Sequence, residues 1–199
     1  MPTPTIPGYR FYEYLLVLDP HDDLHDRIKK VKAEFGERYK AATANNKAHI
    51  TLVKFITWGM MEEKILHRLH TIAMGAIPFK VELKDFGSFP SHTIYINVPT
   101  KLPIQYLVKE LKPAQRLMKA HPDKPPHFMD TPHLTIARKL KPWQYEQGWL
   151  EYSHRSFTGR FIADSMLLLK RPAGEIGYRP VKRFPFENLP VNTKQGNLF

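Results

Sequence analysis

The sequence predicts a chain of mixed helices and strands, of α/β or α+β class, built from two related halves. Segments with strand character alternate along the chain with segments whose apolar residues recur at helical spacing. A six-residue pattern at 49–54 occurs again at 133–138. With 199 residues, the chain has the length of one domain or of two intimate halves of roughly 100 residues each.

The first part of the chain predicts the order strand, helix, strand, helix and two strands. Aromatic and aliphatic residues predict a strand over 10–18, which Asp19-Pro20 closes. A helix is expected from 21 to about 40, because four apolar residues recur there at helical spacing: Leu24, Ile28, Val31 and Phe35. The further elements expected are a strand over 48–55, a helix over 60–74, and strands over 79–86 and 93–98 joined by a turn at 87–91.

The second part repeats this order loosely, which suggests an internal duplication. A helix is expected over 102–118, broken or restarted at Pro113, before a Pro-rich loop at 121–127. The elements expected after that loop are a strand over 132–139, a short helix over 142–151, one or two strands within 157–170, a turn region at 171–177 and an extended segment over 178–186. A polar tail follows and is expected to be loosely ordered.

The basic charge of the chain is concentrated in its second half. Residues 1–99 carry 13 basic and 11 acidic side chains, a net charge of +2, whereas residues 100–199 carry 17 and 8, a net charge of +9. This excess predicts a polyanionic partner, with RNA or another phosphorylated ligand as the usual candidate. A basic surface kept for solubility is the alternative.

Composition excludes several classes of protein. The absence of cysteine excludes disulfide scaffolds, thiol nucleophiles, thiolate zinc sites and iron–sulfur clusters. No apolar run approaches the ~18 residues of a membrane span, and residues 1–10 lack the apolar segment of a signal peptide. A soluble, cytoplasmic protein without a membrane partner is therefore expected. No P-loop, dinucleotide-binding fingerprint or G-x-S-x-G is present.

The repeated hexapeptides are His-Ile-Thr-Leu-Val-Lys at 49–54 and His-Leu-Thr-Ile-Ala-Arg at 133–138. In a strand, side chains alternate between faces, so His49 and Thr51 project together while the apolar residues between them face the core. The same holds for His133 and Thr135. Each copy therefore presents an imidazole beside a hydroxyl, unless these are half-buried strands whose polar residues satisfy only local hydrogen bonds.

Two imidazoles facing one cleft can serve as general base and general acid at neutral pH. One removes a proton from an attacking water or hydroxyl, and the other protonates the leaving oxygen. The two threonine hydroxyls can donate hydrogen bonds to phosphate oxygens, where charge develops in the transition state. The scheme needs no metal or cofactor and fits phosphodiester hydrolysis, especially the opening of a 2′,3′-cyclic phosphate.

Lys54 and Arg138 are candidate substrate-binding residues, since each occupies the last position of its repeat. Strict alternation places both on the face opposite the imidazoles. Contact with a phosphate then requires a bulge, a twist or a strand end. A basic residue at a solvated strand end is the alternative.

Two other classes of function remain open. A metal hydrolase is one, because His21 and His25 stand near Asp22, Asp23 and Asp26, and His67 and His70 are also closely spaced, although no H-E-x-x-H occurs. A non-catalytic RNA-binding module is the other. Its candidate stacking residues are the aromatic side chains Tyr9, Phe11, Tyr12, Trp143, Tyr145 and Trp149.

At the two hexapeptides, whose histidines are 84 residues apart, the chain resembles the two-histidine (2H) phosphoesterase superfamily. It is most similar to the 2′-5′ RNA ligase and RNA 2′,3′-cyclic phosphodiesterase family, whose second motif reads H-x-T-L-A-R. The ending from Tyr178 to Phe186 also resembles that of the family, although the first motif lacks the family's glycine at its usual place.

This resemblance implies a bilobal, pseudo-twofold α+β fold in which two antiparallel sheets flank a central cleft. It implies one domain over 1–187, followed by a tail at 188–199. It further implies cyclic phosphodiesterase chemistry carried by His49, Thr51, His133 and Thr135, with possible reversal into 2′-5′ ligation. The substrate is expected to be RNA or a small nucleotide with a cyclic phosphate, and the protein a monomer.

Overall fold

The computed structural model describes residues 9–43, 47–119 and 123–190. The strands are β1 (Phe11–Leu18), β2 (Ile50–Trp58), β3 (Phe79–Lys84), β4 (Phe86–Phe89), β5 (Thr93–Asn97), β6 (His127–Phe128), β7 (His133–Arg138), β8 (Thr158–Ala163), β9 (Ser165–Pro172) and β10 (Arg179–Pro185). The helices are α1 (Asp22–Tyr39), α2 (Glu62–Gly75), α3 (Leu102–Leu111), α4 (Gln115–Met118) and α5 (Pro142–Tyr152), with 3₁₀ turns η1 (Gly59–Met61) and η2 (Lys112–Ala114).

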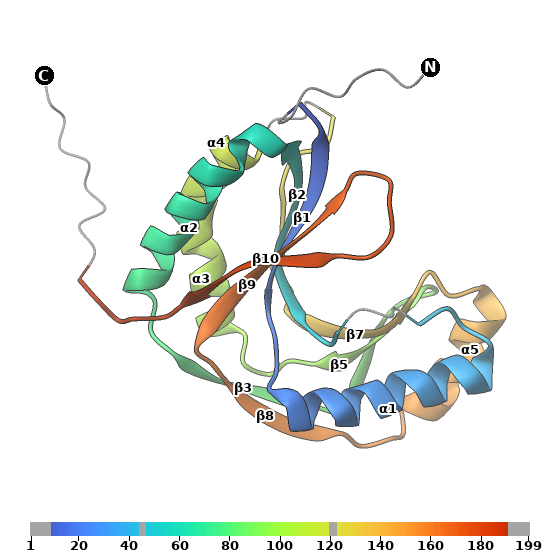
Figure 1. Cartoon of the computed structure of the whole chain (residues 1–199). Helices are drawn as coiled ribbons and strands as arrows, with labels where there is room; N and C mark the ends of the chain where they lie inside the picture. The colour runs from blue at the N-terminus through green and yellow to red at the C-terminus, as the bar shows by residue number, and fades with distance from the viewer. Residues whose placement is uncertain (1–8, 44–46, 120–122, 191–199) are drawn as a thin grey trace, which may run out of the picture.

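Most strands belong to one antiparallel sheet with the order β10-β9-β1-β2-β7-β5-β4, in which β6 also pairs with β2. A separate antiparallel sheet consists of β3 and β8. Within the large sheet, β2 meets β7 at the pair Ile50 and Leu134. Figure 1 shows β1 and β2 running upright and β5 and β7 lying across the molecule below them. The predicted α+β class with two antiparallel sheets is confirmed.

The two spatial halves do not coincide with the two halves of the sequence. One half combines β1 and β2 with β9 and β10 from the far end of the chain, and the other combines β4 and β5 with β7. Each half nevertheless contains one hexapeptide, on β2 or on β7. The duplication visible in the motifs is therefore interleaved along the chain.

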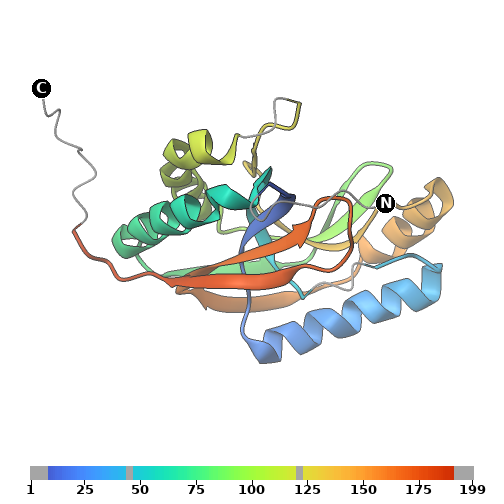
Figure 2. The same ribbon diagram turned by 45° about the horizontal axis from the view of Figure 1, so that its top comes forward.

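Helices cover the outer sides of both halves. α2 packs on β10 and α3 on β2, whereas α1 packs on β7 and α5 on β5. Figure 2 shows the strands between these two groups of helices. A continuous cluster of buried apolar residues runs through both halves and includes Leu16 of β1, Ile50 of β2 and Leu134 of β7.

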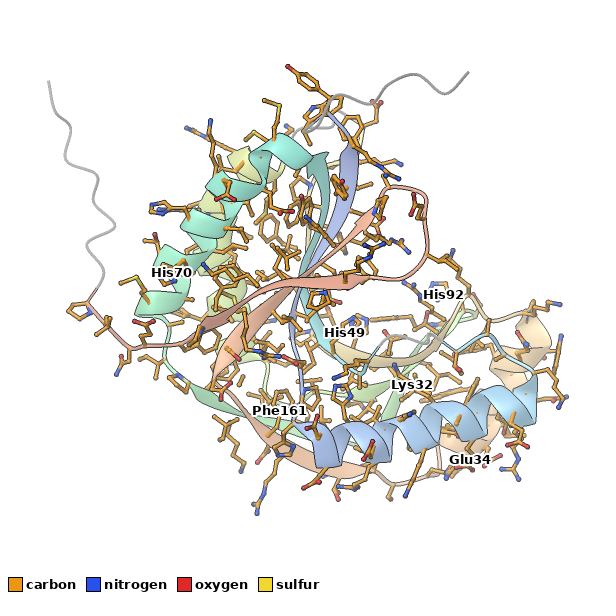
Figure 3. The ribbon with its side chains drawn as sticks, in the orientation of Figure 1. Lys32, Glu34, His49, His70, His92 and Phe161 are labelled. Atoms are coloured by element: carbon orange, nitrogen blue, oxygen red, sulfur yellow. The ribbon has the colours of Figure 1, made fainter. Side chains whose placement is uncertain are left out.

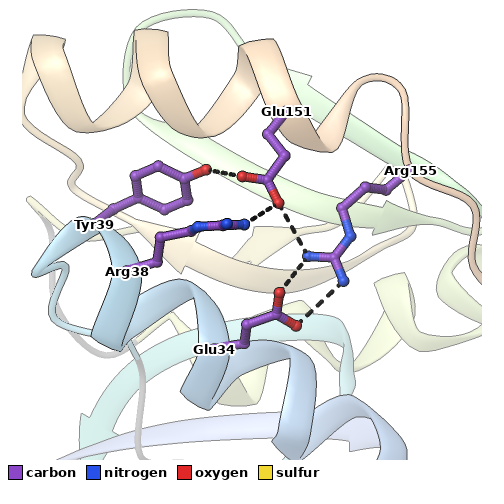
Figure 4. Close-up of polar contacts among 5 residues, drawn as sticks. All are labelled: Glu34, Arg38, Tyr39, Glu151 and Arg155. Atoms are coloured by element: carbon purple, nitrogen blue, oxygen red, sulfur yellow. Dashed lines mark hydrogen bonds and ion pairs between the residues drawn. The ribbon is translucent and has the colours of Figure 1, made fainter.

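A cluster of polar contacts fixes α1 against α5 (Figure 4). Arg155 donates to both carboxylate oxygens of Glu34 at 2.8 and 3.2 Å. Arg38 and the hydroxyl of Tyr39 each donate to Glu151 at 2.5 Å. These bonds join residues more than 100 positions apart. They hold the C-terminal half of α1 over the β7 side of the molecule.

The structure differs from the predicted elements in three respects. The expected turn at 87–91 begins inside a strand, because Asp85 adopts a left-handed conformation (φ 54°) that separates β3 from β4. As a result β4 pairs with β5, while β3 pairs with β8. In α1 the buried face includes Lys32, whereas Val31 is half-buried.

Two further predictions concern the Pro-rich loop and the C-terminal tail. The short strand β6 begins at the last residue of the expected Pro-rich loop, part of which falls outside the described residues. The expected tail also lies mostly outside them. Its first residues dock on α2, where the amides of Asn188 and Leu189 donate to the carbonyls of Ala76 and Met74 at 3.0 and 2.8 Å.

Candidate active site

The site begins at the point where the two hexapeptides pair with each other. Ile50 and Leu134, the residues that follow the two histidines, are antiparallel partners. Extending this register by one residue in either direction sets Thr51 beside His133 and His49 beside Thr135. The junction of the sheet therefore brings together the two imidazoles and two hydroxyls that the sequence analysis singled out.

A cavity of about 180 Å³ lies over this junction. It is lined by Leu15, Lys32, His49, Thr51, Lys54, Phe89, Thr93, Met129, His133, Thr135, Arg138 and Tyr178. All six predicted site residues are among them. The lining combines three cationic side chains with two imidazoles and contains no carboxylate among the described residues, so it suits an anion.

A bulge in each hexapeptide explains how Lys54 and Arg138 reach this cavity. Along β2 the register with β1 passes from Thr51 to Val53 and skips Leu52. Along β7 the register with β5 passes from Thr135 to Ala137 and skips the residue between them. The extra residue resets the alternation of side chains. The basic residue thus returns to the face of the imidazole, and the expectation from strict alternation is wrong in both repeats.

The two histidines are held in the same tautomer. Nδ1 of His49 lies 2.8 Å from the carbonyl oxygen of Lys47, and Nδ1 of His133 lies 2.8 Å from that of Thr131. Since a carbonyl only accepts, Nδ1 carries a proton and donates in both cases. Nε2 is therefore the nitrogen left to exchange protons with a substrate in the cavity.

The surroundings of the two imidazoles differ. The His133 ring packs edge-on against Phe89, with centroids 4.9 Å apart, and lies 5.2 Å from the Tyr95 ring. The charges of Lys32 and Arg138, which line the same cavity, act on His49. One imidazole is thus supported by aromatic rings and the other stands beside cations.

Burial lowers the pKa of both histidines, to different extents. For His49 burial is the main cause, and the charges of Lys32 and Arg138 add to it, so that its pKa falls from 6.5 to about 4. For His133 burial lowers the pKa, while the hydrogen bond to the Thr131 carbonyl opposes the change. His49 is therefore the imidazole that stays unprotonated over the wider range of pH.

Lys54 belongs to a polar network behind the cavity. Its Nζ lies 3.2 Å from Glu13 on β1, which also accepts from Arg171 at 2.5 Å and from the hydroxyl of Tyr178. Burial opposes ionisation of Glu13, but the Tyr178 hydroxyl and the charges of Lys54 and Arg171 keep its pKa below the usual value. Burial and the bond to Glu13 raise the pKa of Tyr178, which remains a neutral donor.

The sequence analysis missed Lys32 and Glu13, and it noted Tyr178 only as part of a family-like ending. Both missed residues carry a signal in the sequence. Lys32 occupies a buried position on α1, and Glu13 stands within an otherwise apolar strand that becomes buried. A charged residue in an apolar stripe marks a buried ionic site.

The residues behind the other two interpretations lie elsewhere. His21 and His25 are at the start of α1, and His67 and His70 are on α2; none lines the cavity. Within the described residues no group of three or more His, Asp or Glu side chains is placed to hold a metal ion.

Among the aromatic candidates for stacking, only two are exposed. Tyr9 is 58% and Trp143 44% exposed. The others pack within the protein: Phe11 stacks on Trp58, with ring centroids 3.6 Å apart, and Tyr12, Tyr145 and Trp149 pack against the core.

Comparison with known proteins shows the family of this chain. A family model described as the 2′-5′ RNA ligase superfamily matches residues 20–175. The chain belongs to this superfamily. The resemblance to the 2H phosphoesterases, drawn from the hexapeptides, is confirmed. A search of curated protein sequences gave no match, and no helix within the described ranges is long and apolar enough to cross a membrane.

Several solved structures share the fold. E. coli LigT complexed with 3′-AMP is 17% identical, with a TM-score of 0.62, covering 89% of this chain and 98% of LigT. LigT complexed with NADP+ gives a TM-score of 0.63 at 17% identity, covering 89% and 99%. A protein from Thermus thermophilus is 14% identical, with a TM-score of 0.61, covering 88% and 98%. At these identities the likeness concerns the fold.

Proposed function

We propose that this protein is a metal-independent cyclic phosphodiesterase that opens 2′,3′-cyclic phosphates at RNA ends or on small nucleotides. One observation carries the proposal: two imidazoles in the same tautomer and two threonine hydroxyls line one cation-rich cavity. The nucleotides named in the LigT complexes, 3′-AMP and NADP+, support a nucleotide ligand. The active unit is a monomer formed by residues 1–187, working in the cytoplasm.

In the hydrolytic direction, water attacks the phosphorus and gives a proton to Nε2 of His49. The bond from phosphorus to one ribose oxygen breaks, and that oxygen takes a proton from Nε2 of His133. His49 is assigned as the base because its lower pKa keeps it unprotonated. Thr51 and Thr135 donate to the non-bridging oxygens, and Arg138 and Lys54 offset their charge. When a 5′-hydroxyl end takes the place of water, it gives its proton to His49, and the 3′ oxygen that leaves phosphorus takes a proton from His133, so that a 2′-5′ linkage forms; the reverse of this step cleaves the linkage.

The test is turnover of a nucleoside 2′,3′-cyclic phosphate, and of an oligonucleotide ending in one, in excess EDTA. Wild type is compared with His49→Ala and His133→Ala, and with His67→Ala, an exposed histidine of α2, as the matched control. Turnover should survive EDTA and His67→Ala and vanish in the two site variants. The substrate ratio reports whether RNA is preferred. Binding of RNA without turnover of either substrate would favour the non-catalytic module, and loss in EDTA the metal hydrolase.

A further inference from the structure

Lys32 occupies a position on α1 that would ordinarily be apolar. The buried face of this helix consists of Leu24, Ile28, Phe35 and Tyr39, with Lys32 among them at 8% exposed. A lysine is rarely buried to this degree unless an ionic or polar function requires it. The burial of the Lys32 amine must therefore be explained by the groups that it faces.

Lys32 faces the catalytic cavity. It lines the same space as His49, Thr51 and Arg138. In Figure 3 it projects from the side of α1 that is turned toward His49, whereas His70 lies away on α2. The contacts between α1 and α5, with Glu34 and Arg38 on α1 just beyond Lys32, hold this helix in place. The amine is thus delivered to the cavity by a fixed element.

The charges that line the cavity together with Lys32 favour an anion. The neighbouring cation whose charge acts on it is Arg138, and the lining of the cavity includes no carboxylate among the described residues. Lys54, the third cation of the lining, lies 3.2 Å from Glu13. An anion that binds between Lys32 and Arg138 is attracted by both positive charges.

We propose that Lys32 binds a non-bridging oxygen of the substrate phosphate beside His49, and so orients the substrate between two imidazoles that are otherwise equivalent. The hexapeptides supply a nearly symmetric pair of acid–base groups, and Lys32 has no counterpart in that repeat. The bound phosphate is drawn toward Lys32 and Arg138. This role rests on the proposed function, since it assigns a contact in the same site.

The electrostatics of His49 agree with this placement. Burial is the main cause of its low pKa, and Lys32 and Arg138 lower it further, while Asp19 after β1 acts in the opposite direction. The charge of Lys32 therefore reaches His49 in the free protein. Removal of that charge should raise the pKa of His49, and this effect can be observed without any substrate.

The experiment compares Lys32→Met and Lys32→Gln with Lys30→Met, which removes an exposed lysine of the same helix. Calorimetry measures the binding of inorganic phosphate and of adenosine 3′-monophosphate, and NMR follows the titration of the His49 ring. Both Lys32 variants should weaken binding by about 10–100-fold, as expected for a charge-assisted hydrogen bond. Both should raise the pKa of His49, and Lys30→Met should do neither.

Affinity within about twofold of wild type in a folded Lys32 variant, with an unchanged His49 titration, would overturn the role of Lys32. Two neutral replacements are used so that a folding defect in one leaves the other to decide. Binding and titration do not depend on turnover. A wild-type protein that binds phosphate through Lys32 but hydrolyses no cyclic phosphate would therefore refute the proposed function and leave the anion site standing.

Discussion

The two halves of the candidate site share a backbone geometry but differ in the charges that surround it. In both, a histidine donates from Nδ1 to a carbonyl two residues earlier, a threonine follows, and a bulge returns the basic residue to the same face. Around the first motif, Lys54 is held beside Glu13. Around the second, no carboxylate among the described residues forms an ion pair with Arg138, and Lys32 lies near it.

This difference separates the properties that arise close to the motif from those that come from distant segments of the chain. The tautomer of each histidine depends on a carbonyl two residues earlier, and the bulge is a shared feature of the two strands that carry the motif. The charge environment comes from β1, α1 and the C-terminal hairpin, which are distant in sequence. Two copies of one motif can therefore take unequal parts in one reaction.

The largest expected effect distinguishes the roles of the two imidazoles by comparing substrates with different leaving groups. On a 2′,3′-cyclic phosphate, His49→Ala and His133→Ala should each lower kcat by about 10²–10⁴-fold. On a bis(nitrophenyl) phosphodiester the leaving phenolate needs no proton, so His133→Ala should lose much less and His49→Ala should keep its loss. Steady-state kinetics on both substrates measure this contrast. The reverse pattern would exchange the roles of the two histidines.

A smaller effect distinguishes the two basic residues of the motifs. Arg138→Met should lower kcat/KM by about 10–100-fold, because it removes a charge-assisted contact to phosphate. Lys54→Met should lower it by only about two- to fivefold, since Glu13 already offsets that charge. Lys139→Met, an exposed neighbour of Arg138, is the matched control. Equal losses at Arg138 and Lys54 would contradict the asymmetry of the cavity.

The pH dependence of kcat/KM tests the same asymmetry in the free enzyme. The base must be unprotonated, so activity falls below the His49 pKa of about 4. The acid must be protonated, so activity falls above the His133 pKa, which burial places below 6.5. The optimum should lie between these values, with a decline of about tenfold from pH 6.5 to 7.5. An optimum above pH 7 in kcat/KM would contradict these assignments.

The last expected effect concerns stability and does not involve a substrate. Burial, with Arg138 nearby, lowers the pKa of Lys32 from 10.5 to about 8, so the unfolded chain binds this proton more tightly than the folded protein. Stability contributed by this group therefore rises with pH between 8 and 10.5. At pH 7, the free energy of unfolding of Lys32→Met should be about 2–3 kcal/mol higher than that of wild type, so the variant is the more stable protein. Urea titrations should show that gap narrowing by pH 10, while Lys30→Met gives a constant difference.

Much of this architecture could be predicted from local patterns. The apolar periodicity of β1, α1 and α2 predicted the bounds of these elements closely. The six predicted site residues all line the cavity. The adjacent apolar residues Leu52-Val53 and Ile136-Ala137 were an available signal for the two bulges, because in both pairs the two residues are buried together.

What could not be predicted depends on contacts between distant segments. A charged residue such as Glu13 in an apolar strand marks a buried polar site, but its partners Arg171 and Tyr178 lie 158 and 165 positions away. The left-handed turn at Asp85 likewise redirects a strand to a partner more than 70 residues further along. Such pairings are decided by topology and not by composition.

The Ile50–Leu134 pair makes the narrowest hydrogen-bonded link between the two halves coincide with the reacting centre. The ladders on either side, β1 with β2 and β5 with β7, are long and resist distortion. A small rotation about this link would change the spacing of the two imidazoles and leave those ladders intact. The spacing of the two imidazoles therefore depends on how one half of the large sheet is oriented relative to the other at this pair.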